Sequence, residues 1–449
     1  MELLRLVVID ALTIISFSSK SVDAYSSEAK NQTAMSTLTF AGWREGAMRI
    51  IVTGASGFVG RELVPLLADA GEKLLLVGRN TEVLQRFFPD QAVCDYASLA
   101  QEAKGFDVLI HLAVASPDSA ASLATYRDIN VDFTCKVAQM AREAGVACFV
   151  HVSSSDALDG QNQSGYAVSK REAKERLKSF AGLEVINVYL PLVYGRKWSG
   201  RLAWLNRLPK GLANRLFRAF AALKPTVNIE RFAEFLIKML PALEAKEEEV
   251  ILSDPQGKNP FFLVPKRLID IGFALSVAVF LCWLLILIWV AIRAQSPGPG
   301  IIAQTRVGRN GVEFTCYKYR TMLVGTIQAG THEVSKAAVT ALGRFLRRTK
   351  LDELPQIINI MRNEVSLIGP RPCLPMQIEL IEARRRCGVL DIKPGITGLA
   401  QINGIDMSDP HRLALWDFRY MRLQSLLLDI RILMSTLAGK GRGDRVSSV

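Results

Sequence analysis

Two acidic residues and several cations lie close together around the segment TKLDELPQI, residues 349–357. Asp352 and Glu353 are adjacent, Arg347 lies five residues before Asp352, and Arg371 lies in the rigid turn GPRP. One carboxylate can bind Mg²⁺, which prefers hard oxygen ligands. The other can attack phosphorus where positioned cations spread the charge that would repel an anionic nucleophile. These residue types and spacings predict a phosphoryl-transfer site.

The surrounding segment, residues 341–372, is expected to form two helices that meet at this acidic pair. Pro355 suits the first turn of the second helix, where its missing N–H costs nothing. Asp352 would then lie at or just before the N-terminus of that helix, where the dipole and free amides favour its ionised form. An ordinary helix cap is the alternative for an isolated pair of this kind, but the neighbouring arginines favour a binding site.

A second group of residues that could bind a ligand or carry out chemistry follows Met48. Gly54, Gly57 and Gly60 come after an apolar strand and begin a helix, so that backbone amides at the helix N-terminus can approach a pyrophosphate. Arg79 ends the next apolar strand, where an acidic residue would bind a ribose 2′-hydroxyl. An arginine there favours a 2′-phosphate, and hence NADP over NAD.

Tyr166 and Lys170 are four residues apart and therefore share one helical face. An ammonium beside a phenol can lower the phenol pKa and make it a proton donor or acceptor at neutral pH. Ser155, at the end of an apolar strand, can orient a substrate hydroxyl. A lone Tyr-x-x-x-Lys pair is common, but its place after a glycine-rich turn and a serine-ended strand favours a catalytic role.

Strands alternate with helices through residues 48–258, which predicts an α/β fold with a doubly wound, Rossmann-like parallel sheet. The domain is expected to end near Lys258, where an acidic run gives way to Pro, Gly and Lys. Residues 1–47 show neither a good signal peptide nor a membrane span. We expect this extension to be disordered, or translation to begin at Met48.

An uncharged apolar segment runs from Ile271 to Ile292, and its 22 residues would extend about 33 Å as a helix, enough to cross the hydrocarbon layer of a bilayer. Residues 261–449 carry 25 Lys and Arg against 14 Asp and Glu, so most of the net charge of +12 lies in this half. Beside a membrane segment, acidic lipid is a more suitable anion than nucleic acid, for which no recognition motif is found. A buried core helix is the alternative.

Residues 48–258 resemble the extended short-chain dehydrogenase/reductase family that acts on nucleotide sugars. The resemblance rests on the motifs GASGFVG, HLAVA, SSS, YAVSK and LPLVYG. It implies that Tyr166 and Lys170 are catalytic, with Ser155 or Ser154 as their partner. The part after Gly195 that usually forms the sugar pocket is short, so a purely NADP-binding or structural role is the alternative.

Residues 265 to about 435 resemble the bacterial sugar transferases, which are monotopic phosphoglycosyl transferases. The resemblance rests on KRLID, SPGP, AQTRVGRNG, YKYRTM, LGRFLRRTKLDELPQ, SLIGPRP and KPGITGLAQING. It implies that Asp352 is the nucleophile of a covalent phosphosugar intermediate and that Glu353 binds Mg²⁺. Ile405 departs from the family pattern, in which an arginine is common.

The same resemblance implies that Arg347, Arg371 and Lys318 bind phosphate. Gln304 and Arg320, on short strands before the acidic pair, are further candidates for contacts with substrate or phosphate. A membrane-associated α+β catalytic domain is therefore expected at residues 296–437.

A re-entrant helix is expected at residues 266–295. NADP and nucleotide sugars are cytosolic, and both flanks of the apolar segment are basic, as cytoplasmic flanks tend to be. A simple crossing would therefore separate one domain from its ligand. A Ser-Pro pair would be expected at the break, but Cys282 and Trp283 stand there.

The remaining segments are assigned by composition. We expect a linker at residues 259–265 and a basic tail at residues 438–449. Residues 413–437 suit an amphipathic helix that lies either against the domain core or at the lipid interface. The three arginines 384–386 suit a solvated or lipid-facing patch.

The resemblances together imply an enzyme of the bacterial inner membrane with both domains on the cytoplasmic face. It would move a phosphosugar from a UDP-sugar to polyprenol (undecaprenyl) phosphate and release UMP, with Mg²⁺ as its metal. The alternative is a membrane-anchored NADP-dependent nucleotide-sugar reductase or epimerase, or a bifunctional enzyme. A homodimer is left open, and the sugar is not specified.

Overall fold

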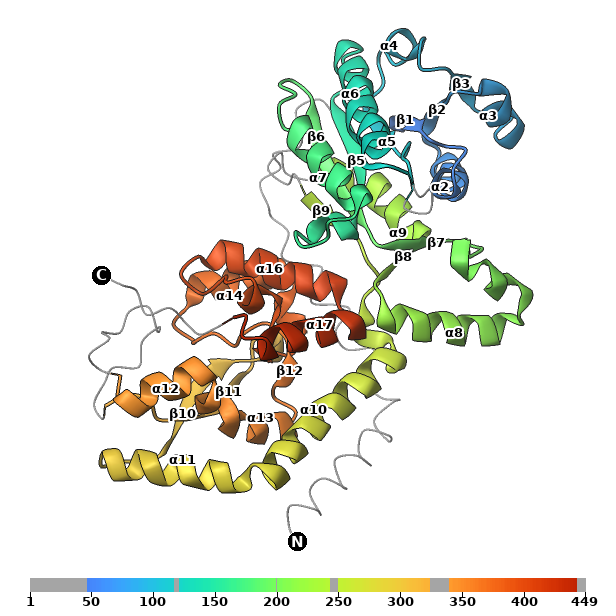
Figure 1. The fold of residues 1–449 in the computed structure, drawn as a ribbon. Helices are drawn as coiled ribbons and strands as arrows, with labels where there is room; N and C mark the ends of the chain where they lie inside the picture. The colour runs from blue at the N-terminus through green and yellow to red at the C-terminus, as the bar shows by residue number, and fades with distance from the viewer. Residues whose placement is uncertain (1–46, 117–120, 199, 243–248, 324–338, 442–449) are drawn as a thin grey trace, which may run out of the picture.

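The computed structural model describes residues 47–116, 121–198, 200–242, 249–323 and 339–441 (Figure 1). The predicted N-terminal extension and most of the predicted basic tail lie outside these residues. Figure 1 shows an α/β domain formed by the first half of the chain and a mainly helical domain formed by the second half.

The N-terminal domain is built on a parallel sheet of seven strands within the described residues, in the order β3-β2-β1-β4-β5-β6-β9. The strands are β1 (Arg49–Thr53), β2 (Lys73–Val77), β3 (Ala92–Cys94), β4 (Val108–His111), β5 (Cys148–Ser154), β6 (Glu184–Leu190) and β9 (Glu249–Ile251). Ile50 and Val52 point into one core and Ile51 into the other, because successive side chains leave opposite faces of a strand.

Helices cover both faces of this sheet. The main ones are α2 (Phe58–Asp69), α3 (Thr81–Phe87), α4 (Leu99–Glu102), α5 (Leu123–Arg127), α6 (Thr134–Glu143), α7 (Gly165–Leu177) and α9 (Ile229–Glu234). Shorter turns are η2 (Asp128–Phe133), η3 (Ser155–Leu158), η5 (Phe235–Met239), η6 (Leu240–Ala242) and η7 (Gln256–Lys258). Buried side chains of α2 and α9 pack in one core, and those of α4 and α6 pack in the other. The predicted doubly wound, Rossmann-like fold is confirmed.

A small arm extends from this domain after β6. It comprises β7 (Leu192–Tyr194), η4 (Gly200–Arg207), α8 (Lys210–Leu223) and β8 (Thr226–Asn228), with β7 and β8 paired in parallel. Leu205, Ala213 and Phe217 form the buried centre of the arm. Most of the arm is the segment after Gly195. In the family that residues 48–258 resemble, this segment usually forms the sugar pocket, and it is short here.

Two apolar helices, α10 (Pro260–Phe280) and α11 (Cys282–Gln295), follow and are bent by 68° relative to each other. Within the described part of the chain, neither is alone long and apolar enough to span a membrane, whereas the two together meet that criterion of length and composition. The break falls at Leu281, directly before the predicted Cys282 and Trp283. The predicted linker at residues 259–265 is instead helical from Pro260, because the Asn259 side chain caps the helix by accepting from the N–H of Phe261.

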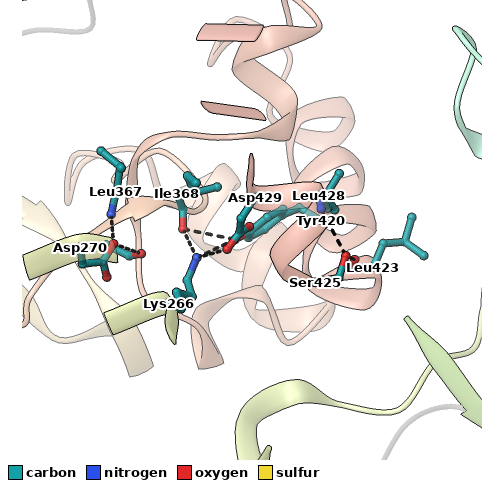
Figure 2. Close-up of polar contacts among 10 residues, drawn as sticks. Lys266, Asp270, Leu367, Ile368, Tyr420, Leu423, Ser425, Leu428 and Asp429 are labelled. Carbon is teal, nitrogen blue, oxygen red and sulfur yellow. Dashed lines mark hydrogen bonds and ion pairs between the residues drawn. The ribbon is translucent and has the colours of Figure 1, made fainter. Parts of the chain in front are cut away.

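The KRLID motif fixes α10 to the C-terminal domain, as Figure 2 shows. Lys266 Nζ donates to Ile368 O at 3.0 Å and to the Asp429 carboxylate at 2.6 Å. Asp270 accepts from the backbone N–H of Leu367 at 2.8 Å. Residues 266 and 270 are one turn apart, so both face the domain. The bent pair is thereby attached through charged and polar side chains on one face of α10.

The C-terminal domain contains two short two-stranded sheets and several helices. Its elements are β10 (Ile301–Val307), η8 (Arg309–Gly311), β11 (Glu313–Tyr319), α12 (Ala341–Thr349), η10 (Leu351–Gln356), α13 (Ile357–Met361), β12 (Ser366–Ile368), α14 (Ile378–Arg386), η11 (Val389–Asp391), β13 (Gly395–Thr397), α15 (Leu399–Ile402), α16 (Pro410–Leu423) and α17 (Leu426–Leu437). β10 and β11 form an antiparallel hairpin, and β12 pairs in parallel with β13. The segment predicted as one amphipathic helix is thus two helices. They bury Leu413, Tyr420 and Ile432 in the domain, while Ile430 and Met434 are exposed.

The two domains contact each other through α16 and α17. Glu249 on β9 forms ion pairs with Lys174 on α7 and with Arg419 on α16. Arg431 on α17 forms an ion pair with Asp159, which follows η3. Phe418 and Leu423 of α16 pack against the buried side chains of Ala157, Tyr189 and Ile251. These contacts join the two halves directly.

Candidate active site

The acidic pair lies at a sharp turn between α12 and η10. Lys350 ends α12 in the left-handed region, with φ of 58°, and its N–H donates to the backbone oxygen of Arg347. η10 then begins at once, with Asp352 and Glu353 in its first turn. The predicted meeting of two helical segments at this pair is present.

Glu353 is buried, and one of its carboxylate oxygens forms ion pairs with two cations. Its Oε1 lies 3.0 Å from Lys318 Nζ and 3.0 Å from an Arg371 guanidinium nitrogen. Lys318 comes from β11 and Arg371 from the GPRP turn, so three separate elements meet here. The structure brings together these three predicted site residues.

Asp352 lies beside Glu353 and is affected by the same charges. Burial, together with the negative charge of Glu353, raises the pKa of Asp352 to about 6. The cations Lys318, Arg371 and Arg347 act in the opposite direction. The cations suit an anionic ligand, whereas the raised pKa of Asp352 departs from the expectation that its position favours the ionised form, because burial and the charge of Glu353 outweigh the cations.

One face of the β10–β11 hairpin contributes further polar groups. Gln304 lies opposite Cys316, and Lys318 lies opposite Ile302, so Gln304 and Lys318 share that face. Gln304 Oε1 accepts from Arg306 Nη2 at 2.7 Å, and Arg306 Nη1 donates to the backbone oxygen of Pro372 at 3.0 Å. Gln304 therefore orients Arg306 beside the GPRP turn.

Arg306 is a residue that the sequence analysis did not select. Its charge, like those of Lys318 and Arg371, lowers the pKa of Cys316, which burial raises more strongly. The charges of all three cations therefore act on the same thiol. The sequence did contain a signal for Arg306, because it is two residues after Gln304 in a strand and therefore shares a face with it.

Two other predicted cations have different surroundings. Arg347 Nε donates to Thr321 Oγ1 at 2.9 Å, which holds its side chain against the end of the hairpin. Arg320 is buried and donates to the backbone oxygens of Ser296 and Pro297, both at 2.8 Å. These contacts favour a structural role for Arg320 in attaching the hairpin to the end of α11, and its phosphate contact stays a prediction.

The turn that carries Arg371 is held by a hydrogen bond from a buried arginine, Arg384. Arg384 on α14 is 2% exposed, forms an ion pair with Asp417 on α16 at 2.7 Å, and donates to the backbone oxygen of Arg371 at 2.9 Å. The prediction of a solvated patch at residues 384–386 is therefore wrong for Arg384, while Arg385 and Arg386 are exposed. A run of three charges did not indicate which one faced inward.

The residues present are compatible with Mg²⁺ bound jointly with a diphosphate. Mg²⁺ in nucleotide sites takes one or two carboxylates and completes its shell with phosphate oxygens and water. Glu353 provides one such carboxylate, whose Oε1 also forms ion pairs with Lys318 and Arg371. Among the described residues, there is no group of three or more His, Cys, Asp and Glu side chains that could hold a metal ion.

The glycine-rich turn of the N-terminal domain has the tight packing that its pattern predicts. Gly54 has φ of 73°, and a Cβ there would lie 2.6 Å from the backbone nitrogen of Ala113. A Cβ on Gly60 would lie 2.4 Å from Ala55 Cα, and Gly57 is the N-cap of α2. Arg79 is exposed just after β2. These positions are compatible with a dinucleotide whose pyrophosphate lies at the start of α2.

The Tyr166 and Lys170 pair is present on α7, but its electrostatics differ from the expectation. Burial raises the pKa of Tyr166 to about 12 and lowers the pKa of Lys170 to about 7. Lys170 Nζ donates to the backbone oxygen of Val152 at 2.9 Å. The prediction of a lowered phenol pKa is therefore wrong for this structure, because burial outweighs any effect of the ammonium.

Of the two serines that the resemblance offered, Ser154 is the one that lowers the pKa of Tyr166, although burial and the charge of Asp156 raise that pKa more strongly. Ser154 ends β5, and Ser155 begins η3. Asn130 in η2 is a further polar residue that the sequence did not suggest. Its side chain accepts from the N–H of Ala115 and donates to Ser169 Oγ on α7.

Two family models match the chain, one in each half. A family model described as "Bacterial sugar transferase" matches residues 261–440, and the "NAD dependent epimerase/dehydratase family" matches residues 50–251. Undecaprenyl-phosphate glucose phosphotransferase of Komagataeibacter xylinus is 32% identical over 46% of this chain and 39% of its own length. EpsL of Bacillus subtilis, an uncharacterized sugar transferase, is 36% identical over 39% of this chain and 86% of its own length.

Among solved structures, UDP-N-acetylglucosamine 4-epimerase from Bacillus cereus matches 46% of this chain and 76% of its own, at 19% identity and a TM-score of 0.36. By its own sheet order and by the family model of its second half, the chain joins a Rossmann-like α/β domain to a transferase-type domain that carries a bent apolar helix pair. It belongs to the bacterial sugar transferase family. It spans about two fifths of the length of the first curated relatives that it matches.

Proposed function

We propose that this protein is a phosphoglycosyl transferase that moves a phosphosugar from a UDP-sugar to polyprenol phosphate. The observation that carries the proposal is Glu353, whose Oε1 is 3.0 Å from both Lys318 and Arg371, with Asp352 adjacent to it. The names of several relatives describe transfer of glucose or galactose phosphate to undecaprenyl phosphate, which supports the same reaction.

The proposed first step is attack by an Asp352 carboxylate oxygen on the β-phosphorus of the donor. An oxygen–phosphorus bond forms, the bond to the bridging oxygen breaks, and UMP leaves with that oxygen. Lys318, Arg371 and Arg306 offset the charge that accumulates on the phosphate oxygens. A Mg²⁺ ion held by Glu353 and the diphosphate would neutralise the leaving phosphate.

The proposed second step transfers the phosphosugar to the lipid. A phosphate oxygen of the polyprenol phosphate attacks the same phosphorus, and the bond to Asp352 breaks. The carboxylate is regenerated and the product is a polyprenyl diphosphate sugar. The covalent intermediate divides one difficult displacement into two with the same cation set.

The proposed location is the cytoplasmic face of the bacterial inner membrane, with α10 and α11 as a re-entrant pair. Support comes from the 68° bend and from the exposed apolar side chains of Leu268, Phe280, Ile286 and Val290. Both flanks should therefore lie on one side. Cysteines introduced at Gly257, which precedes α10, and at Pro299, which follows α11, are expected to react with an impermeant maleimide only after the cells are permeabilised.

The nucleophile is tested with the Asp352→Asn variant in purified membranes. We expect loss of UMP release, and loss of protein-bound label from a donor whose β-phosphate is radioactive. Asp391→Asn, which alters an exposed acid of the same domain, is the matched control and should retain both. UMP release at an undiminished rate in Asp352→Asn would exclude the assigned nucleophile.

A second activity is proposed for the N-terminal domain, as an NADP-dependent reductase or epimerase of a nucleotide sugar. The packed glycine turn and the Ser154, Tyr166 and Lys170 cluster favour it. Bound NADP would exchange hydride, while Tyr166 would hold or move the proton of a sugar hydroxyl. The test is NADPH oxidation with a 4-keto UDP-sugar. We expect Ser154→Ala to reduce the rate more than Ser155→Ala, and Arg79→Ala to weaken NADPH binding more than NADH binding.

A further inference from the structure

The arm of the N-terminal domain carries a concentration of positive charge that neither proposed active site uses. Residues 196–224 contain eight Lys and Arg and no Asp or Glu. Those whose exposure the structure describes are all exposed: Arg196, Lys197, Arg207, Lys210, Arg215, Arg218 and Lys224. Such a surface attracts anions over a distance of about a Debye length, roughly 8–10 Å at physiological salt.

Helix α8 of the arm also has an exposed apolar stripe. Leu212, Leu216 and Leu223 are 48%, 40% and 43% exposed. Their spacing of four and seven residues places them along one side of the helix. Ala213 and Phe217 face the buried centre of the arm instead. An apolar stripe bordered by cations is the pattern of helices that lie in a membrane interface.

The position of α8 is fixed relative to the bent helix pair. Arg218 Nη2 donates to Lys258 O at 2.9 Å, and Asn259 Nδ2 donates to Arg218 O at 3.0 Å. Gln256 Nε2 donates to Ala221 O at 2.7 Å. The two helices are in contact, and Figure 1 shows α8 extending beside the start of α10. The C-terminal end of the stripe, at Leu223, therefore lies on the part of α8 that is attached to the start of α10.

We propose that this arm, residues 196–224, is a second membrane contact that binds an anionic phospholipid surface. Its cations would face lipid headgroups, and the stripe of α8 would enter the interface. Two features favour lipid as the occupant. The charge is complementary to anionic headgroups, and α8 contacts α10, on which the apolar side chains of Phe261, Val264 and Leu268 are exposed. The same surface of a second copy of the chain is disfavoured, because it would bring two sets of eight like charges together.

The consequence is that the N-terminal domain is held at the membrane by its own lipid contact as well as by its link to α10. The proposal adds to the proposed membrane location of α10 and α11, and it does not involve the transfer chemistry. An anionic leaflet should therefore strengthen the contact, since each cation near such a surface contributes about a fivefold gain in affinity.

The test uses the full chain in nanodiscs, with Leu216→Cys carrying an environment-sensitive fluorophore. Cys282 and Cys387, which are not buried, are replaced by serine. Discs contain phosphatidylcholine alone or mixed with phosphatidylglycerol, and each includes a doxyl-labelled quencher lipid. We expect quenching at position 216 in the anionic discs to exceed that in neutral discs by about threefold or more. The same label at Glu82→Cys on α3 should not be quenched.

A charge variant and a matched control separate lipid binding from other causes. Replacing Arg207, Lys210 and Arg215 by Gln should remove most of the anionic preference. Replacing Arg86, Lys104 and Lys136, three exposed cations elsewhere on the domain, should leave it unchanged. Equal quenching in both kinds of disc, no quenching, or a fluorescence change that depends on protein concentration without lipid would each overturn the proposal. Co-elution of the protein with discs reports on α10 and α11 separately.

Discussion

Arg384 and Asp417 form a buried ion pair, with 2.7 Å between guanidinium and carboxylate, directly beneath the turn that carries Arg371. The same guanidinium donates to the backbone oxygen of Arg371. Arg384 has no contact with the acidic pair in the described structure, but it positions Arg371, which does. Arg384 thereby connects α14 and α16 to the turn of Arg371, and Arg371 in turn pairs with Glu353 of the acidic pair.

Replacing Arg384 by Met should strongly destabilise the C-terminal domain. Asp417 would be left as a buried, unpaired carboxylate, a loss of about 3–5 kcal/mol in the free energy of unfolding. Thermal unfolding in detergent measures it. Arg385→Ala is the control, because the exposed pair of Arg385 with Glu382 contributes at most about 0.5 kcal/mol. Similar losses in both variants would contradict the structural role of Arg384.

Gly343→Ala should impair the site despite the better helix propensity of alanine. A Cβ at position 343 would lie 2.1 Å from the backbone oxygen of Thr321, so α12 must move away from the hairpin end that holds Arg347. We expect a loss of about 1–3 kcal/mol in stability and weaker UDP-sugar binding. Gly211→Ala on α8 meets no atom within 4 Å and should be neutral or stabilising by up to about 1 kcal/mol. Equal effects of the two changes would count against this packing.

Stability of the N-terminal domain should depend on pH through Lys170. Burial lowers the folded-state pKa from 10.5 to about 7, so between these values the unfolded chain binds the proton and the folded chain does not. The contribution of Lys170 to stability is therefore present above pH 10.5 and is lost as the pH falls toward 7. Without cofactor, wild-type stability should rise with pH by about 1 kcal/mol per unit relative to Lys170→Met between pH 7.5 and 9.5. Parallel pH profiles of unfolding for the two proteins would refute this.

Glu249→Gln should loosen the contact between the two domains. Its carboxylate pairs with Lys174 on its own domain and Arg419 on the other, and these pairs outweigh burial, so its pKa is lowered. Loss of the charge should cost about 1–2 kcal/mol and increase protease cleavage near residues 252–258. Glu175→Gln alters an exposed acid on α7 and serves as the control. An unchanged cleavage rate would show that the apolar contacts of α16 are sufficient.

Local patterns were enough to predict several features of the molecule. The alternation of apolar strands with helices indicated the parallel sheet, and Gly54, Gly57 and Gly60 indicated the tightly packed turn before α2. The acidic pair and its arginines lie within one short stretch, so their proximity was visible in sequence. The apolar run indicated the helix pair and nearly located its break, which falls at Leu281.

Contacts between distant segments required the folded chain. Lys318 reaches Glu353 across 35 residues, whereas Arg320, on the same short segment, donates instead to the backbone oxygens of Ser296 and Pro297, which precede the hairpin. Burial likewise separates Arg384 from its two neighbours and reverses the expected pKa of Tyr166. Sequence patterns record what neighbouring residues share, namely periodicity, turns and composition. Which side of an element faces inward, and which charge finds a partner, depends on packing against elements that are remote in the chain.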